Sequence, residues 1–200
     1  MDLNLNGKKA LVTGASKGIG LGIAKRLVLE GCHVLLVARN EDDLKNTQNN
    51  LSELNQNVTV DFKAMDLSIT AEVESLAREN VGLDILVNNA GAIPAGNIDR
   101  VDEDTWRAAW DLKLFGYISL CRGIYANMSK RQEESGQRVI LNIIGAGGER
   151  PSSGYIAGAG ANAGLMAITR AMGGVSRKHG IRVLGINPGQ IVTERLETMQ

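Results

Sequence analysis

The sequence predicts an α/β fold with a doubly wound parallel sheet of the Rossmann type, six strands with helices on both faces. Three observations support this fold class. Short apolar runs alternate with longer helical patterns along the chain. The short runs are almost continuously apolar, as in Val34-Leu35-Leu36-Val37, which is typical of strands buried on both faces. A glycine-rich turn follows the first of these runs and opens the first helical pattern.

Strands and helices are expected in strict alternation, which favours right-handed crossovers. The predicted strands are Lys9–Thr13, His33–Val37, Val58–Phe62, Ile85–Asn88, Val139–Ile143 and Arg182–Ile186. The predicted helices are Ile19–Glu30, Glu41–Leu54, Ala71–Asn80, Asp102–Arg131 and Ala157–His179. Because no linker or shift in composition interrupts this order, we expect a single domain over residues 1–200.

Composition limits the classes of partner. The 22 basic and 22 acidic residues cancel, so no charge excess favours nucleic acid or a membrane surface. No apolar run approaches the ~20 residues that a membrane helix needs, and the N-terminus lacks a signal-peptide core. Cys32 and Cys121 are far apart, which is typical of thiols in a reducing compartment. We therefore expect a cytoplasmic protein that acts on a small-molecule substrate and has no metal site.

The glycine-rich turn has the sequence Thr13-Gly14-Ala15-Ser16-Lys17-Gly18-Ile19-Gly20. Glycines allow a tight turn and let the backbone approach a diphosphate, while the following helix presents free N–H groups to the anion. The turn lies at a strand–helix junction, the context that a dinucleotide-binding motif requires. We predict that a dinucleotide binds here, through Gly14, Ser16, Lys17, Gly18, Ile19 and Gly20.

This Thr-Gly-x-x-x-Gly-x-Gly form resembles the short-chain dehydrogenase/reductase family. Three further segments follow in family order: Asp66-Leu67, Asn88-Asn89-Ala90-Gly91, and Asn187-Pro188-Gly189 with Thr193 beyond. The resemblance covers essentially the whole chain. It implies that Asp66 and Leu67 contact adenine and that Asn89, Ala90 and Gly91 line the cofactor. It also implies that the nicotinamide end meets Pro188, Gly189, Ile191 and Thr193.

Two expectations about the whole molecule come from the same resemblance. Family members usually continue into a helical segment that covers the substrate and into a seventh strand, so the domain is expected to lack the usual final strand. They usually assemble as dimers or tetramers through two long helices. The resemblance therefore implies a homodimer or homotetramer through Asp102–Arg131 and Ala157–His179.

The end of the second strand indicates which cofactor is accepted. An acidic residue there binds the ribose 2′-hydroxyl of NAD, whereas this chain has Ala38 followed by Arg39. Lys17 adds a second cation from the glycine-rich turn. Two cations without a carboxylate attract a 2′-phosphate, so we predict NADP(H) rather than NAD(H). The alternative is that Lys17 and Arg39 are solvated surface charges.

The family's usual catalytic side chains are Tyr with Lys four residues later, Ser, and an Asn on the preceding helix. The flanking sequences Leu112–Gly116, Asn142–Gly145 and Asn162–Ala167 resemble the segments that carry them. This register places Lys113, Gly145, Gly158 and Asn162 at the positions of Asn, Ser, Tyr and Lys, so all four usual side chains are missing. A register based on Tyr155 fails because Ala159 stands four residues later.

Lys113 and Asn162 resemble the family's Asn and Lys with places exchanged. We hypothesise that they face each other near the ribose and that Lys113 takes over part of the missing lysine's role. The alternative is a surface lysine on an amphipathic helix. Gly145 and Gly158 predict an emptier pocket, or close packing of the helix against a neighbour.

Tyr155 is the remaining candidate proton donor, one helical turn before Gly158. Helical side chains lean toward the N-terminus, which would carry the phenol away from position 158 unless Tyr155 lies in the preceding loop. The leading function is therefore an NADP(H)-dependent oxidoreductase that transfers hydride between nicotinamide and a carbonyl or alcohol by a non-standard proton path. The alternative is a catalytically silent NADP(H)-binding sensor or partner subunit.

Overall fold

A computed structural model describes residues 3–131, 138–189 and 191. Six strands form one sheet in the order β3-β2-β1-β4-β5-β6, and every pairing is parallel. This order, with its switch between β1 and β4, confirms the predicted doubly wound Rossmann-type sheet. The strands are β1 Lys9–Thr13, β2 His33–Ala38, β3 Val60–Ala64, β4 Ile85–Asn88, β5 Arg138–Ile143 and β6 Ile181–Ile186.

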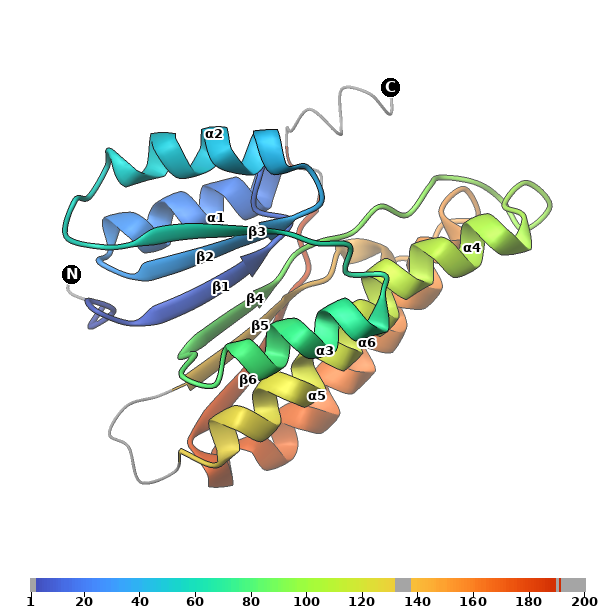
Figure 1. The fold of residues 1–200 in the computed structure, drawn as a ribbon. Coiled ribbons are helices and arrows are strands. Elements are labelled where there is room, and N and C mark those ends of the chain that lie inside the picture. Colours follow the sequence, from blue (N-terminus) through green and yellow to red (C-terminus); the bar gives the residue numbers. More distant parts are fainter. Residues whose placement is uncertain (1–2, 132–137, 190, 192–200) are drawn as a thin grey trace.

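Helices cover both faces of the sheet, as predicted: α1 and α2 lie on one face, and α3, α5 and α6 on the other (Figure 1). The helices are α1 Gly18–Leu29, α2 Glu41–Ser52, α3 Thr70–Glu79, α4 Glu103–Trp110, α5 Gly116–Ser129 and α6 Ile156–Ser176. The single helix predicted over Asp102–Arg131 is instead divided, because a π-helical segment, Asp111–Phe115, joins α4 to α5. A short 3-10 turn, Arg177–His179, extends α6.

The third strand begins two residues later than predicted. Val60 is the first residue of β3 and pairs with Val34 of β2, and the pairing continues to Ala38 and Ala64. β3 is an edge strand with a neighbour on one side only. The apolar pattern of β3 in the sequence is therefore weak. The hydrogen-bonded pairing with β2, and not the run of apolar residues, determines where β3 begins and ends.

The core lies in two layers, one on each face of the sheet. Along β1, Ala10 and Val12 belong to the cluster that includes Val28 of α1, whereas Leu11 belongs to the cluster with Leu76 of α3. This alternation follows from the two-residue period of a strand. A third cluster joins α4, α5 and α6 beyond the sheet. The strands are thus fixed from both sides, and their carboxyl ends form a rigid base for the loops.

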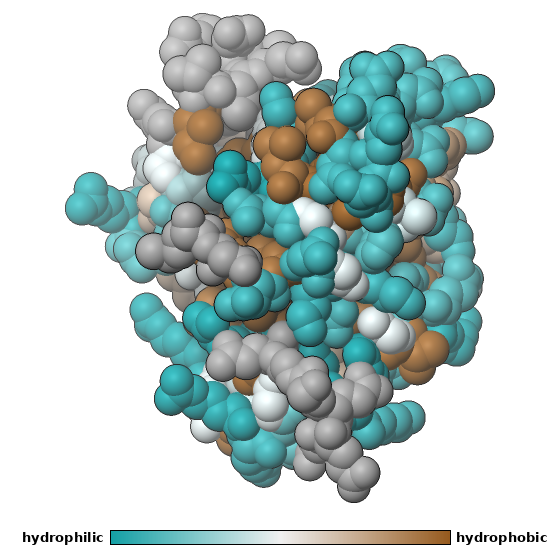
Figure 2. All heavy atoms as spheres, turned by 90° about the vertical axis from the view of Figure 1, so that its left-hand side faces the viewer, coloured by the Kyte–Doolittle hydropathy of each residue, from teal (hydrophilic) through white to brown (hydrophobic). Residues whose placement is uncertain are grey.

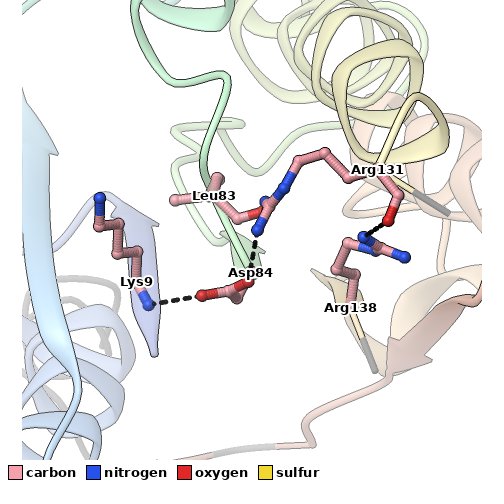
Figure 3. A network of polar contacts seen from close by, with 5 residues as sticks. All are labelled: Lys9, Leu83, Asp84, Arg131 and Arg138. Atoms are coloured by element: carbon pink, nitrogen blue, oxygen red, sulfur yellow. Dashed lines mark hydrogen bonds and ion pairs between the residues drawn. The ribbon is translucent and has the colours of Figure 1, made fainter. Parts of the chain in front are cut away.

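A polar network ties the amino ends of the central strands together (Figure 3). The amide of Lys9 donates to the Asp84 carboxylate at 3.0 Å, and Arg131 pairs with the same carboxylate at 3.2 Å. Arg131 also donates to the carbonyl of Leu83 at 2.9 Å, and Arg138 donates to the carbonyl of Arg131.

Figure 2 views the molecule from the side where β1 begins, and hydrophilic atoms cover most of that face.

Three further observations bear on the function classes. Within the described ranges, none of the helices combines the length and the apolar character needed to cross a bilayer. The same residues contain no group of three or more His, Cys, Asp or Glu side chains placed to hold a metal ion. Cys32 and Cys121 are both free thiols, and both are buried.

Candidate functional site

The glycine-rich turn between β1 and α1 requires glycine at three positions. Gly14 and Gly18 have φ values of +63° and +57°, in the left-handed region that favours glycine. A Cβ atom on Gly20 would lie 2.2 Å from the carbonyl oxygen of Gly14, so only glycine fits there. α1 begins at Gly18, and the side chain of its N-cap residue, Lys17, makes no capping hydrogen bond. The first amides of α1 are thus left for an anion.

Asn89 fixes this turn to the end of β4. Its Nδ2 donates to the carbonyl oxygens of Thr13 and Gly14 at 3.0 and 3.1 Å. The backbone amides of Asn89 and Ala90 donate to the Thr13 hydroxyl at 2.8 and 3.0 Å. Asn89 and Ala90 therefore lie against the glycine-rich turn. Sequence reasoning missed Thr13 itself, whose hydroxyl at the end of a buried strand accepts two of these four hydrogen bonds.

Asp66 follows β3, and Arg39 follows β2 at the same edge of the sheet. The Asp66 carboxylate accepts hydrogen bonds from the amide and the hydroxyl of Ser68, at 3.0 and 2.7 Å. The Ser68 amide holds the pKa of Asp66 below its usual value, and the charge of Arg39 adds to this effect. The strand-end residue is Ala38, as the sequence argument had it, but Asp66 after β3 adds a carboxylate near Arg39 that this argument did not consider. Leu67, beside Asp66, is buried.

Lys113 points inward from the π-helical segment and is only 8% exposed. Its Nζ donates to the carbonyl oxygen of Ile143 at 2.7 Å and to the Tyr117 hydroxyl at 3.0 Å. A Cβ atom on Gly91 would lie 2.8 Å from Lys113 Cδ, so Gly91 leaves room for this side chain. Burial raises the pKa of the Tyr117 hydroxyl well above its usual value. The alternative of a surface lysine is wrong, and the ammonium lies at the end of β5.

Tyr155 lies just before α6, as its N-cap residue, with φ −141° and ψ 42°. Its ring is folded onto the helix: a Cβ atom on Gly158 would lie 2.0 Å from Cε1 and Cζ and 2.6 Å from the hydroxyl oxygen. Tyr155 thus lies in the loop before the helix, the case in which the expected lean away from position 158 does not apply. The expectation of an emptier pocket at Gly158 is wrong, because the ring fills that space.

Asn162 lies one turn further along α6 and is 3% exposed. Its Nδ2 is 3.0 Å from the position of a Cβ atom on Gly145, whose φ is +131°. Its Oδ1 is buried and has no hydrogen-bond partner among the described residues. A buried acceptor without a partner costs about 1–3 kcal/mol, which a bound hydroxyl group would recover.

The segment after β6 lies against the turn that follows β5. The carbonyl of Pro188 accepts a hydrogen bond from the Ala146 amide at 3.0 Å. Gly189 is exposed, and Ile191 is 45% exposed. Thr193 lies outside the described residues. Pro188 is thus close to the loop that also carries Gly145.

A parallel sheet that switches direction between β1 and β4, with a glycine-rich turn at its first strand–helix junction, defines a Rossmann-type nucleotide-binding protein. The sequence profile of the short chain dehydrogenase family matches residues 8–200. The chain belongs to this family.

Several known proteins are similar over nearly the whole chain. The 3-oxoacyl-[acyl-carrier-protein] reductase of Vibrio cholerae is 30% identical over 197 residues, which are 98% of this chain and 79% of that protein. The D-beta-hydroxybutyrate dehydrogenase of Cupriavidus necator is 30% identical over 94% of this chain and 72% of its own length. The L-sorbose reductase of Gluconobacter frateurii, solved with NADPH and L-sorbose, superposes with a TM-score of 0.91 at 32% identity and covers 100% of this chain and 75% of that one.

Proposed function

We propose that the chain is an NADP(H)-dependent oxidoreductase that interconverts a carbonyl and an alcohol on a small molecule. The observation that carries this proposal is the turn at the start of α1, where a Cβ atom on Gly20 would lie 2.2 Å from the Gly14 carbonyl and Asn89 fixes the turn. The NADPH bound to the similar L-sorbose reductase supports the cofactor. When bound, NADP(H) supplies or accepts a hydride.

The described residues fit this cofactor in two respects. No side chain caps the first amides of α1, which are left for an anion, and the Asn162 Oδ1 is a buried acceptor that lacks a donor among the described residues. A diphosphate is proposed to bind at Gly14, Ser16, Lys17, Gly18, Ile19 and Gly20. The adenosine half is proposed to contact Arg39, Asp66 and Leu67, and the nicotinamide half Asn89, Ala90, Gly91, Pro188, Gly189, Ile191 and Thr193.

Preference for NADP(H) over NAD(H) is proposed to come from Lys17 and Arg39, which are both exposed. The nearby Asp66 carboxylate partly offsets the charge of Arg39 but is itself hydrogen-bonded to Ser68. We expect NADPH to bind more tightly than NADH in a fluorescence titration. Replacing Arg39→Ala should weaken NADPH binding about tenfold and leave NADH binding unchanged. The matched control is Arg26→Ala on α1, which should change neither affinity.

Equal loss of NADPH and NADH affinity in Arg39→Ala would contradict the assigned 2′-phosphate contact. Failure of the unmodified chain to bind either dinucleotide would overturn the proposed function as a whole.

In the proposed register, Lys113 and Asn162 stand at the catalytic positions of the family with their chemical types exchanged. The Lys113 ammonium, fixed by the Ile143 carbonyl and the Tyr117 hydroxyl, places a positive charge at the end of β5. A fixed cation there would stabilise negative charge that develops on a substrate oxygen. The Asn162 Oδ1 would accept a hydrogen bond from a ribose or substrate hydroxyl.

A silent NADP(H)-binding sensor or partner subunit is the second candidate. The observation that favours it is the absence of any side chain at Gly158, where the tightly packed Tyr155 ring leaves no room for one. A wide panel of ketones, aldehydes and alcohols, assayed at saturating NADPH or NADP⁺, separates the two. Turnover of any member supports the enzyme, whereas saturable binding without turnover supports the silent protein.

Self-association is proposed through the face formed by α4, α5 and α6. Phe115 is 52% exposed there, beside a hollow of about 530 Å³ lined in part by Trp106 and Trp110. We expect a homodimer or homotetramer in size-exclusion chromatography with light scattering, and dissociation in Phe115→Glu. The free thiols of Cys32 and Cys121 support a reducing compartment, and we propose the cytoplasm.

A further inference from the structure

A row of exposed side chains runs along α4 and the π-helical segment that follows it. Glu103, Arg107, Asp111 and Phe115 stand four residues apart, and all four are exposed and line the same hollow. Arg107 donates to the Glu103 carboxylate of its own helix at 2.8 and 2.6 Å. Along the row the charges are therefore negative, positive and negative, and an exposed aromatic ring ends it.

The hollow beside this row has rigid apolar walls. The Trp110 Nε1 donates to the Ala157 carbonyl of α6 at 2.9 Å, and the Trp106 ring packs edge-on against Trp110 with 6.0 Å between the ring centres. Ile98 is 67% exposed at the rim, and Phe115 is 52% exposed. Figure 1 shows that α4 projects beyond the sheet. A preformed apolar hollow between exposed apolar side chains is typical of a protein interface.

The pattern of charges favours a second copy of this chain as the partner. In a twofold contact the same patch meets itself, so the patch must be its own complement. Two copies of the row that pack antiparallel about a point near Ala109 place Arg107 of each copy opposite Asp111 of the partner subunit. Opposite charges then meet twice, and the apolar hollows of both copies are covered in one contact.

The same face adjoins the turn that is proposed to hold the adenosine half of the cofactor. A second hollow of about 240 Å³ shares Asp111 and Phe115 with the first and is lined on its other side by Leu67 and Ser68. The Leu67 carbonyl packs closely on the start of α5, since a Cβ atom on Gly116 would lie 2.7 Å from its oxygen. The turn after β3 is thus in contact with the residues that a second copy would cover.

Three hydrogen bonds join Asp66 to this turn and to α3. Its carboxylate accepts from the amide and the hydroxyl of Ser68, and its amide donates to the Glu72 carboxylate at 2.7 Å. A shift of the turn therefore moves the Asp66 carboxylate. A partner that packs against Leu67 and Ser68 fixes a segment that the bound cofactor must fix too, so each reduces the conformational entropy that the other has to remove.

We propose that a second copy of this chain binds this face and that its binding is coupled to NADP(H) binding through the turn from Asp66 to Ser68. The coupling rests on the proposed function, whereas the contact between copies does not. Two ion pairs between Arg107 and Asp111 of the partner subunit hold the copies in register. Coupling between binding equilibria is reciprocal, so the associated form binds the cofactor more tightly and the cofactor strengthens the association.

The first test reverses the charges. Arg107→Asp places a carboxylate opposite Asp111 of the partner subunit and should halve the molar mass measured by light scattering. Combining it with Asp111→Arg restores opposite charges across the axis and should restore the wild-type mass. Arg78→Asp on α3 is the matched control, because Arg78 pairs with Glu74 four residues away just as Arg107 pairs with Glu103. This control should keep the wild-type mass.

The second test measures the coupling. Both tryptophans of the chain, Trp106 and Trp110, line the hollow, so their emission on dilution reports the association. NADP⁺ is the ligand, because it does not absorb the emitted light. Calorimetry should show NADP⁺ binding to Arg107→Asp about tenfold more weakly than to the wild type. Because a dimer holds two such sites, saturating NADP⁺ should lower its dissociation constant by the square of that factor, about 100-fold.

A wild-type chain that stays monomeric at every concentration would overturn the contact. So would a double variant that fails to recover the wild-type mass. Equal NADP⁺ affinity in the wild type and in Arg107→Asp would overturn the coupling and leave the proposed function standing. Failure of the wild type to bind any dinucleotide would overturn the proposed function and with it the coupling, while the molar masses would still decide whether the contact exists.

Discussion

Replacing Gly20 by alanine tests the turn that is proposed to hold the cofactor. A methyl group there would lie 2.2 Å from the Gly14 carbonyl oxygen and 2.5 Å from Asn89 Nδ2. Ordinary contacts begin near 3.4 Å, so the turn must open by roughly 1 Å. The turn cannot yield cheaply, because the Asn89 side chain also holds the Thr13 carbonyl. We expect overpacking to cost about 1–3 kcal/mol of folding stability.

The same displacement moves amides away from a bound diphosphate. A hydrogen bond to a charged group contributes about 1.5–3 kcal/mol, so the loss of even one weakens binding by about tenfold or more. Fluorescence titration with NADPH measures this directly, and thermal unfolding measures the stability cost. Gly22→Ala is the matched control on the same helix, because its Cβ atom would meet nothing within 4 Å. If Gly20→Ala binds NADPH as tightly as Gly22→Ala does, the turn does not hold the cofactor.

Three other predictions concern stability and chemistry. Lys113→Met removes the buried ammonium but leaves the Tyr117 hydroxyl bonded to the Ile143 carbonyl, so the melting temperature should stay the same. Turnover should fall about tenfold. Unchanged turnover and NADPH affinity would exclude a role for Lys113. Arg131→Met breaks the partly buried ion pair with Asp84 and should lower the folding stability by about 2 kcal/mol, or the melting temperature by roughly 4–8 °C. NADPH affinity should not change. A melting temperature lowered by less than 1 °C would show that the network of Figure 3 contributes little to stability. The lowered pKa of Asp66, caused first by the Ser68 amide, stabilises the fold above the ordinary carboxyl pKa of about 4, and this contribution is lost as the pH falls through the native pKa. Asp66→Asn should therefore flatten the decline of the melting temperature below about pH 4, and an unaltered decline would contradict the assignment.

The sheet and its glycine-rich turn were predictable because their signals are local. A strand buried on both faces is built around an unbroken apolar run, and β1 and β4 have the bounds that were predicted from such runs. The turn needs glycine at Gly14, Gly18 and Gly20 for reasons of backbone geometry, which the sequence displays directly. The predicted position of the edge strand β3 was wrong by two residues. An edge strand has a neighbour on one side only, so its apolar pattern in the sequence is weaker.

The candidate catalytic side chains were harder to place because their positions depend on irregular backbone. Lys113 is turned inward by a π-helical segment, whereas an uninterrupted helix would allow an exposed position. Tyr155 reaches Gly158 because it precedes α6 and has a non-helical backbone. The closeness of Arg39 and Asp66 results from the pairing of β2 with β3, a contact distant in sequence. None of these features leaves a periodic signal.

The measurement that tests the central claim most directly is a crystal structure of the chain with NADP⁺ bound. We predict the diphosphate within hydrogen-bond distance of the amides between Gly14 and Gly20. We also predict that the nicotinamide ring lies beside the Tyr155 hydroxyl, at the end of β5. A cofactor bound elsewhere, or a nicotinamide ring on the far side of the sheet from Tyr155, would contradict the account.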